Sequence, residues 1–143
     1  MTGTRSNARN TAVSATEALG ALRAGQASEM ATTVRCTADI QVVSVDRTLG
    51  STERQAAIRN LQRLRDQANR ALRDLEDNER HIVSNGRYAK DAVDALTAAA
   101  KRLNDEVSGT RSIAERTTEV AGAIDGAADA GDFVISRLMP AEQ

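Results

Sequence analysis

The chain of 143 residues is nearly devoid of aromatic side chains: it has no tryptophan, one tyrosine (Tyr88) and one phenylalanine (Phe133). Strands favour aromatic and β-branched residues, so this shortage argues against a protein built on β-sheet. A single proline and nine glycines exclude a collagen and a proline-rich linker. Apolar residues still make up 41% of the chain, so Ala, Leu, Val and Ile must supply its core.

Cysteine and long apolar runs are scarce as well. The single Cys36 cannot form a disulfide within the chain, and the polar first ten residues lack the apolar segment of a secretory signal. These features predict a cytoplasmic, reducing location, with secretion without a leader left open. No run of 18 apolar residues occurs, so no transmembrane helix is expected. The net charge of −1 gives no overall field that would attract nucleic acid.

What the sequence does contain is a long heptad pattern over residues 57–138. Positions spaced alternately four and three residues apart, beginning at Ala57 and Leu61, form a seam that keeps one phase to the end. Eighteen of these 24 positions are apolar, where a composition of 41% would give about ten. This spacing is typical of long helices that pack side by side.

The width of the apolar stripe separates two helical architectures. A third column, which begins at Ile58, is apolar at nine of its twelve positions, whereas a two-stranded coiled coil usually carries charges there. The opposite column, which begins at Arg59, has no apolar member and should face water. The sequence therefore predicts an all-α fold: an elongated antiparallel bundle of three to four long helices with heptad packing.

Glycine-containing breaks predict the ends of the helices. They occur at 49–51, 84–86 and 108–109, and capping boxes are predicted to follow at Thr52–Gln55 and Ser112–Glu115. The expected helices cover about 6–49, 52–84, 87–108 and 112–138 in one domain, 1–143, and the last two could also form one bent helix.

The first of these helices has a less regular stripe. Apolar residues follow the heptad spacing from Ala8 to Leu22, but the phase falters at Gln26 and Glu29, and Met30 and Val34 are displaced by one position. The phase resumes with three apolar residues, Cys36, Ile40 and Val43. Such a displacement predicts local unwinding of the supercoil. The β-branched stretch 40–45 could also form a strand, but the helical pattern around it favours helix.

No residue combination has the spacing of a catalytic or metal site. Cys36 lies on the apolar stripe, where a free cysteine packs as a small hydrophobe. His81 is the only histidine and is expected to be solvated or to cap a helix. Three acids, Asp125, Asp129 and Asp132, have helical spacing and are expected to form a solvated face. We therefore expect no enzyme, no metal and no cofactor.

An arginine-rich segment is the sharper candidate for binding. Residues 47–73 carry seven arginines and two acids, and four of the arginines share the polar side of the second helix: Arg59, Arg63, Arg70 and Arg73. Acids at helical spacing, such as Asp66, favour a salt-bridged surface. An acidic protein partner is the second interpretation, and nucleic acid is the third, because no aromatic residue is interleaved to stack on a base.

The seam contains many alanines, which bury little area each, so further burial against a partner is expected. The predicted function is a non-enzymatic assembly or adaptor protein that self-associates or docks on a partner helix through its Ala/Leu/Val stripe. The segment 133–139 either closes the core or forms a docking tip. A leaderless secreted effector or export substrate is the alternative function. The expected contact residues are Leu61, Leu64, Leu75, Leu96, Leu103, Phe133, Ile135 and Met139.

Overall fold

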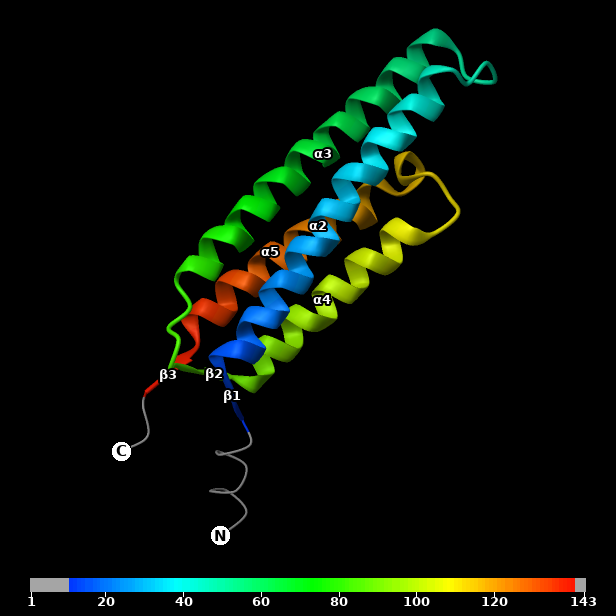
Figure 1. Ribbon diagram of the computed structural model, residues 1–143. Helices are drawn as coiled ribbons and strands as arrows, with labels where there is room; N and C mark the ends of the chain where they lie inside the picture. Colours follow the sequence, from blue (N-terminus) through cyan, green and yellow to red (C-terminus); the bar gives the residue numbers. More distant parts are fainter. Residues whose placement is uncertain (1–10, 141–143) are drawn as a thin grey trace.

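The computed structural model describes residues 11–140, which form a bundle of four helices (Figure 1). These are α2 (Ala15–Ser44), α3 (Ser51–Arg80), α4 (Lys90–Ser108) and α5 (Thr117–Ser136). Successive helices run antiparallel, and each packs mainly against two neighbours in the circular order α2, α3, α5, α4. The predicted all-α bundle is confirmed.

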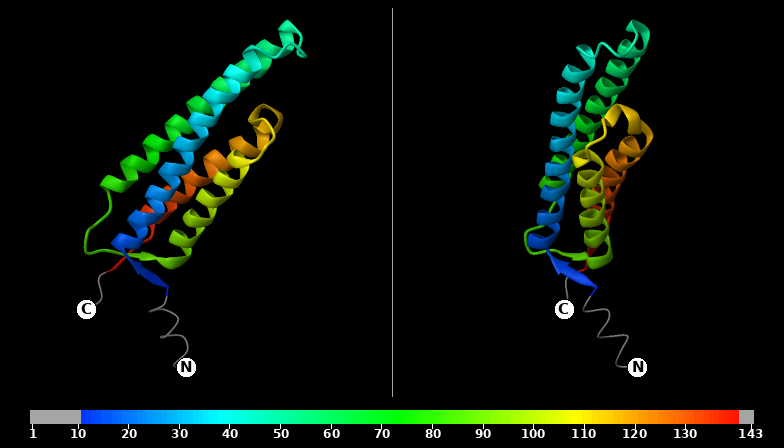
Figure 2. Two further views of the ribbon diagram at one scale, coloured as in Figure 1. Left: turned by 45° about the vertical axis from the view of Figure 1, so that its right-hand side comes forward. Right: turned by 90° about the vertical axis from the view of Figure 1, so that its right-hand side faces the viewer.

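The two hairpins of the bundle differ in length. Helices α2 and α3 have 30 residues each, whereas α4 and α5 have 19 and 20, so the α2–α3 hairpin extends past the other (Figure 2). At 1.5 Å per residue the long helices span about 45 Å. The 3₁₀-helix η1 (Ile113–Arg116) precedes α5 at the shorter hairpin's turn, and its fully buried Ile113 packs into the core.

A small antiparallel sheet lies at the opposite end of the bundle. Its strands are β1 (Ala12–Ser14), β2 (Arg87–Ala89) and β3 (Leu138–Met139), with β2 in the middle. Tyr88 of β2 pairs with Val13 on one side and Leu138 on the other. Its buried hydroxyl accepts a hydrogen bond from the backbone nitrogen of Val83 at 3.0 Å. The sheet therefore joins the start of α2, the α3–α4 connection and the chain after α5.

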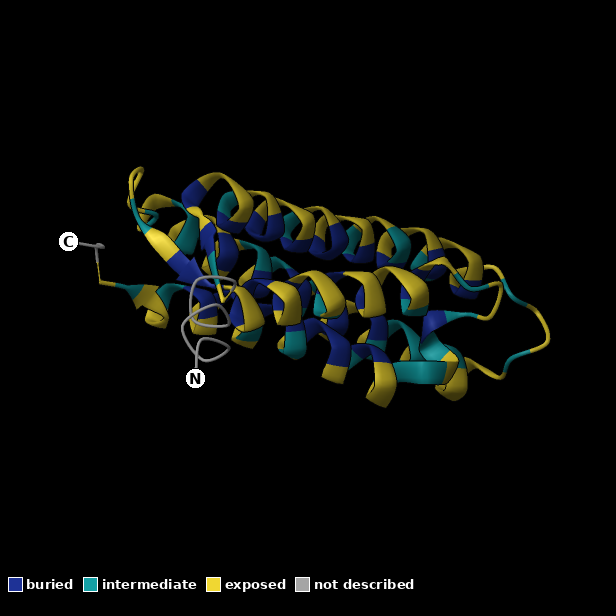
Figure 3. Ribbon diagram, turned by 90° about the horizontal axis from the view of Figure 1, so that it is seen from below, coloured by how far each residue is buried: buried dark blue, intermediate teal, exposed yellow. Residues whose placement is uncertain are grey.

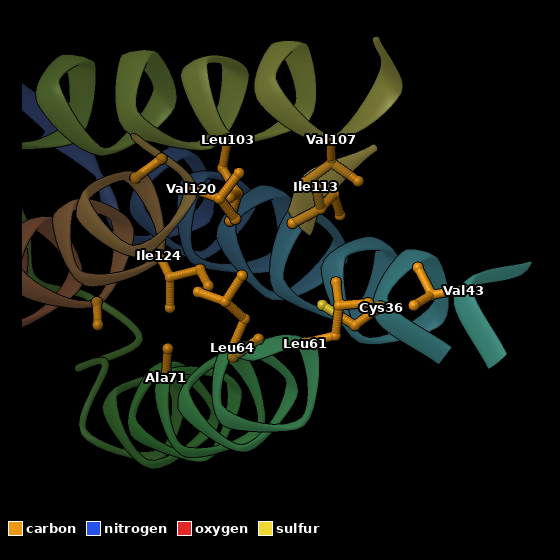
Figure 4. Packing of buried hydrophobic residues seen from close by; sticks show 13 residues of the cluster. Cys36, Val43, Leu61, Leu64, Ala71, Leu103, Val107, Ile113, Val120 and Ile124 are labelled. Atoms are coloured by element: carbon orange, nitrogen blue, oxygen red, sulfur yellow. The ribbon is translucent and has the colours of Figure 1, made fainter. Parts of the chain in front are cut away.

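Burial in α3, α4 and α5 follows the predicted columns. Every residue of the column that begins at Arg59 is exposed, and every residue of the column that begins at Ile58 is buried or half-buried (Figure 3). The seam supplies most of the core, in which side chains from all four helices meet (Figure 4). One apolar cluster lies toward the hairpin turns and a second lies next to the sheet.

Several predicted helix ends are wrong. The first helix begins at Ala15 because residues 12–14 pair in the sheet, and the expected start at 6 lies outside the described residues. It ends at Ser44, after which Asp46 accepts hydrogen bonds from the backbone nitrogen and the hydroxyl of Thr48. The Thr52–Gln55 capping box does not form, since α3 already begins at Ser51. The last helix ends at Ser136 rather than 138. As expected, it is separate from α4, and the stretch 40–45 forms no strand.

Two substitutions on α4 test this assignment of inside and outside. Leu96 is fully buried, so Leu96→Ala should lower the free energy of unfolding by about 2–5 kcal/mol. Asp94 is exposed and forms a surface ion pair with Lys90, so Asp94→Ala should change stability little. Urea denaturation followed by circular dichroism measures both values. Equal losses would contradict the assignment.

Candidate interaction surface

The inner face of α2 is a regular heptad stripe without the predicted displacement. Eight positions spaced alternately four and three residues apart are all buried: Ala18, Leu22, Gly25, Glu29, Thr32, Cys36, Asp39 and Val43. The expected unwinding near Gln26 is therefore wrong. The buried stripe keeps its heptad spacing, and only the polarity of its side chains changes, at Glu29, Thr32 and Asp39. Met30 and Val34, which the apolar pattern placed on a displaced seam, are exposed on the other side of the helix.

This inner face holds all of the buried polar side chains in the described part of the chain: Ser28, Glu29, Thr32 and Asp39. The hydroxyl of Ser28 donates to the carbonyl oxygen of Ala100 on α4 at 2.9 Å. Thr32 donates to the carbonyl oxygen of Ser28 at 2.8 Å, within α2. Both hydroxyls are thus satisfied, as buried polar groups in folded proteins usually are.

A pair of charged residues one helical turn apart fastens α2 to the end of α4. The Arg35 guanidinium contacts the Asp39 carboxylate at 3.0 Å, and Asp39 accepts a hydrogen bond from the backbone nitrogen of Ile113 at 2.9 Å. The last carbonyls of a helix have no partner within it and need outside donors. Arg35 supplies one at the end of α4, donating to the carbonyl oxygen of Val107 at 2.7 Å, and it also donates at 3.0 Å to the carbonyl oxygens of Gly109 and Arg111 in the turn that follows.

Glu29 is the exception among the buried polar residues. It is fully buried on the inner stripe of α2, and neither carboxyl oxygen has a hydrogen-bond partner among the described residues. Burial, with a smaller contribution from the negative charge of Asp125, raises the pKa of Glu29 from 4.5 to about 9. The carboxyl group is therefore protonated at neutral pH when the protein is folded.

Glu29→Gln should stabilise the protein at neutral pH. In the unfolded chain Glu29 is ionised above pH 4.5, so folding must take up a proton, which costs about 3 kcal/mol at pH 7. The contribution of this group to stability is complete below pH 4.5 and is lost progressively as the pH rises toward 9. The unfolding free energies of variant and wild type should therefore diverge by about 1.4 kcal/mol per pH unit across that window.

Urea denaturation of both proteins at several pH values between 4 and 9 measures this difference. Comparison at each pH cancels the other titrating groups, which the two proteins share. A difference that does not change with pH would show that Glu29 titrates normally in the folded protein.

The side of α2 that faces away from the core has the opposite character. Eight positions with the same heptad spacing are all exposed: Gly20, Ala24, Ala27, Ala31, Val34, Ala38, Gln41 and Val45. Four large apolar residues stand out toward water on this side: Met30 (54% exposed), Val34 (65%), Val42 (64%) and Val45 (74%). We call the exposed residues between Ala24 and Val45 the α2 outer face.

The α2 outer face carries no charged residue. The charged residues within 24–45 are Glu29, Arg35 and Asp39, all of which lie on the inner side of the helix or at its edge. The exposed side of α3, by contrast, is mostly charged. Single exposed apolar residues are normal, whereas several on one uncharged side of a helix make a candidate interaction surface. The absence of charged residues from these exposed positions is the sequence signal that could have identified this face.

The residues predicted to make contacts fall into two groups. Five leucines pack inside the bundle, where a partner could reach them only if the helices separated: Leu61, Leu64, Leu75, Leu96 and Leu103. Phe133 is 41% exposed, and the guanidinium of Arg137 lies 5.1 Å from its ring centroid. Ile135 and Met139 are half-buried against the cluster next to the sheet. Their role in binding stays a prediction.

The arginines of α3 do not form the predicted salt-bridged surface. Arg59, Arg63, Arg70 and Arg73 are exposed, and none of them forms an ion pair with the acids that the structure describes. Asp66 is exposed on the same helix, so the charge of this surface is mixed. An acidic partner for these arginines stays a prediction.

The other residues singled out in the sequence have structural positions. The ring of His81 lies at the end of α3, with its Nδ1 2.8 Å from the carbonyl oxygen of Asp77, as expected for a capping residue. Cys36 is buried as predicted, and burial raises the pKa of its thiol to about 11. Asp125, Asp129 and Asp132 are exposed as predicted. Within residues 11–140 no three His, Cys, Asp or Glu side chains gather as a metal site.

Comparison with known proteins adds no relative. No protein-family model, curated protein or solved structure matches the chain. In the described part of the chain, no helix combines the length and the apolar character needed to span a bilayer.

Proposed function

We propose that this chain is a non-enzymatic helical assembly protein that binds another helical surface through the α2 outer face. The observation that carries the proposal is the exposure of an uncharged, apolar strip on one side of a 30-residue helix. A surface helix normally turns its apolar side toward the core and its charged side toward water. Here the bundle covers the side of α2 that carries Glu29, Thr32 and Asp39 and leaves the uncharged side exposed.

The composition of the α2 outer face suits the docking of a helix. Four residues of this face are alanines, whose short side chains let a second helix approach closely: Ala24, Ala27, Ala31 and Ala38. The valines add apolar area, whose removal from water gains about 25 cal/mol per Å². Residues 24–45 span about 33 Å, which is six helical turns.

The inner face of α2 supports the proposal by holding the helix in place. The Ser28 hydroxyl and the Arg35 guanidinium bind carbonyl oxygens of α4 and the turn after it. Gln26 on the α3 side donates to the Glu79 carboxylate at 3.1 Å. These contacts fix the rotation of α2 about its axis. A partner would therefore meet a preformed surface rather than one that must first be ordered.

One substitution on this face and one on another exposed surface test the proposal. Val34→Glu places a charge at the centre of the α2 outer face, and Ala98→Glu places the same charge on the exposed side of α4. In extracts of the native host, wild type and Ala98→Glu should sediment as assemblies larger than 15.2 kDa, and Val34→Glu as a monomer. Circular dichroism should show the same helix content for all three purified chains.

Two results would contradict the proposal. One is a wild-type chain that sediments as a monomer in the extract. The other is a Val34→Glu chain whose assembly remains intact. A loss of assembly in both variants would point to a general effect of added negative charge and would also count against the α2 outer face.

A further inference from the structure

We infer that the partner of the α2 outer face is the same face of a second copy of this chain, with the two α2 helices antiparallel across a two-fold axis. This inference rests on the proposed function and names its partner. It requires a surface that complements itself in shape and in charge.

The heptad stripe on the outside of α2 matches itself in the antiparallel direction. A two-fold axis between Ala31 and Val34 places those two residues opposite each other, and one turn further out it places Ala27 opposite Ala38. At the ends it pairs Gly20 with Val45. Each pair joins the two alternating heptad positions, which is how antiparallel helices interlock. A small residue therefore faces each of the two valines of the stripe.

Charge also favours a second copy in this orientation. The α2 outer face has no charge, so identical surfaces meet without repulsion. Beyond its two ends lie the exposed Glu17, in the first turn of α2, and the exposed Arg47, in the loop after it. The antiparallel register brings Glu17 of each copy beside the loop that carries Arg47 of the other. A parallel pairing would instead place Glu17 next to Glu17 and align the two helix dipoles.

Arg23 does not oppose this packing. It is the one other charged residue on the exposed side of α2, and its guanidinium is drawn toward α3 by the Glu79 carboxylate at 3.3 Å. The α2 outer face comprises eleven exposed residues, fewer than the roughly 20–30 per partner of a standard interface. We therefore expect a dimer with a micromolar rather than a nanomolar dissociation constant.

Single cysteines test the register directly. Ala27→Cys and Ala38→Cys are purified separately, and then each alone and their equimolar mixture are oxidised. A disulfide needs Cα atoms about 4.4–6.8 Å apart, so only residues that face each other across the axis can form it. The buried Cys36 keeps its thiol protonated and should not compete. Ala98→Cys mixed with Ala27→Cys gives the background from random collision.

The expected result is a covalent dimer that forms several-fold faster in the mixture than in either variant alone or in the background mixture. Sedimentation equilibrium of the purified wild-type chain should show a reversible monomer–dimer equilibrium. Faster cross-linking of Ala27→Cys with itself would overturn the inference, since it would show either parallel helices or an antiparallel register centred on Ala27. A purified chain that stays monomeric at high micromolar concentration would overturn it too.

The second of these outcomes separates the inference from the proposed function. If the purified chain is a monomer while the assembly in the extract still depends on Val34, the partner is a different protein, and the proposed function stands. If the extract shows no assembly that depends on Val34, the proposed function fails, whatever the purified chain does.

Discussion

The rotation of α2 about its own axis decides which of its side chains are buried in the bundle and which are exposed to water. Hydrogen bonds add to the apolar contacts of Leu22, Cys36 and Val43 in setting this rotation, because the buried polar side chains of the described residues all lie on the inner face of α2. Arg35 and Asp39 bind backbone groups at the end of α4, in the turn after it and at the start of η1, and Ser28 binds Ala100. If α2 turned by half a revolution, Val34 and Val45 would be buried, but the carbonyl groups at the end of α4 would lose these donors. Buried groups left without partners cost about 1–3 kcal/mol each.

Glu29 shows that this arrangement has a cost. A protonated carboxyl group without partners is a poor core residue, and it lies on the same helix that exposes four large apolar side chains. On α2, burial thus departs from the polarity of the residues in two ways: a carboxyl group is buried and large apolar side chains are exposed. Burial in α3, α4 and α5 follows the sequence columns. Disagreements of this kind concentrate where a protein is constrained by something other than its own stability. For α2, the proposed partner on the outer face would be such a constraint and would account for the exposed valines, but it would leave Glu29 unexplained.

Most of the bundle could be predicted because its signal is regular. In α3, α4 and α5 the apolar seam and the charged column stand opposite each other, so hydrophobic period alone assigns inside and outside. On α2 the buried stripe contains Gly25, Glu29, Thr32 and Asp39, and the exposed stripe contains alanine and valine. A pattern based on hydrophobicity then mixes both faces and reports a displacement that does not exist. The sheet could not be predicted either, because strands of two or three residues form only when distant segments meet.

Pairing of two copies would also change the energetics of the fold. Helix α2 packs one side against the core of its own chain and would pack the other side against the second copy. Folding and dimerisation would therefore both stabilise the same 30 residues. Binding that favours the folded state stabilises it in proportion to the logarithm of partner concentration. A chain with an unsatisfied Glu29 and an alanine-rich seam would then have its lowest stability when dilute and would gain stability as it assembles. Folding and assembly of this protein would in that way be linked through one helix.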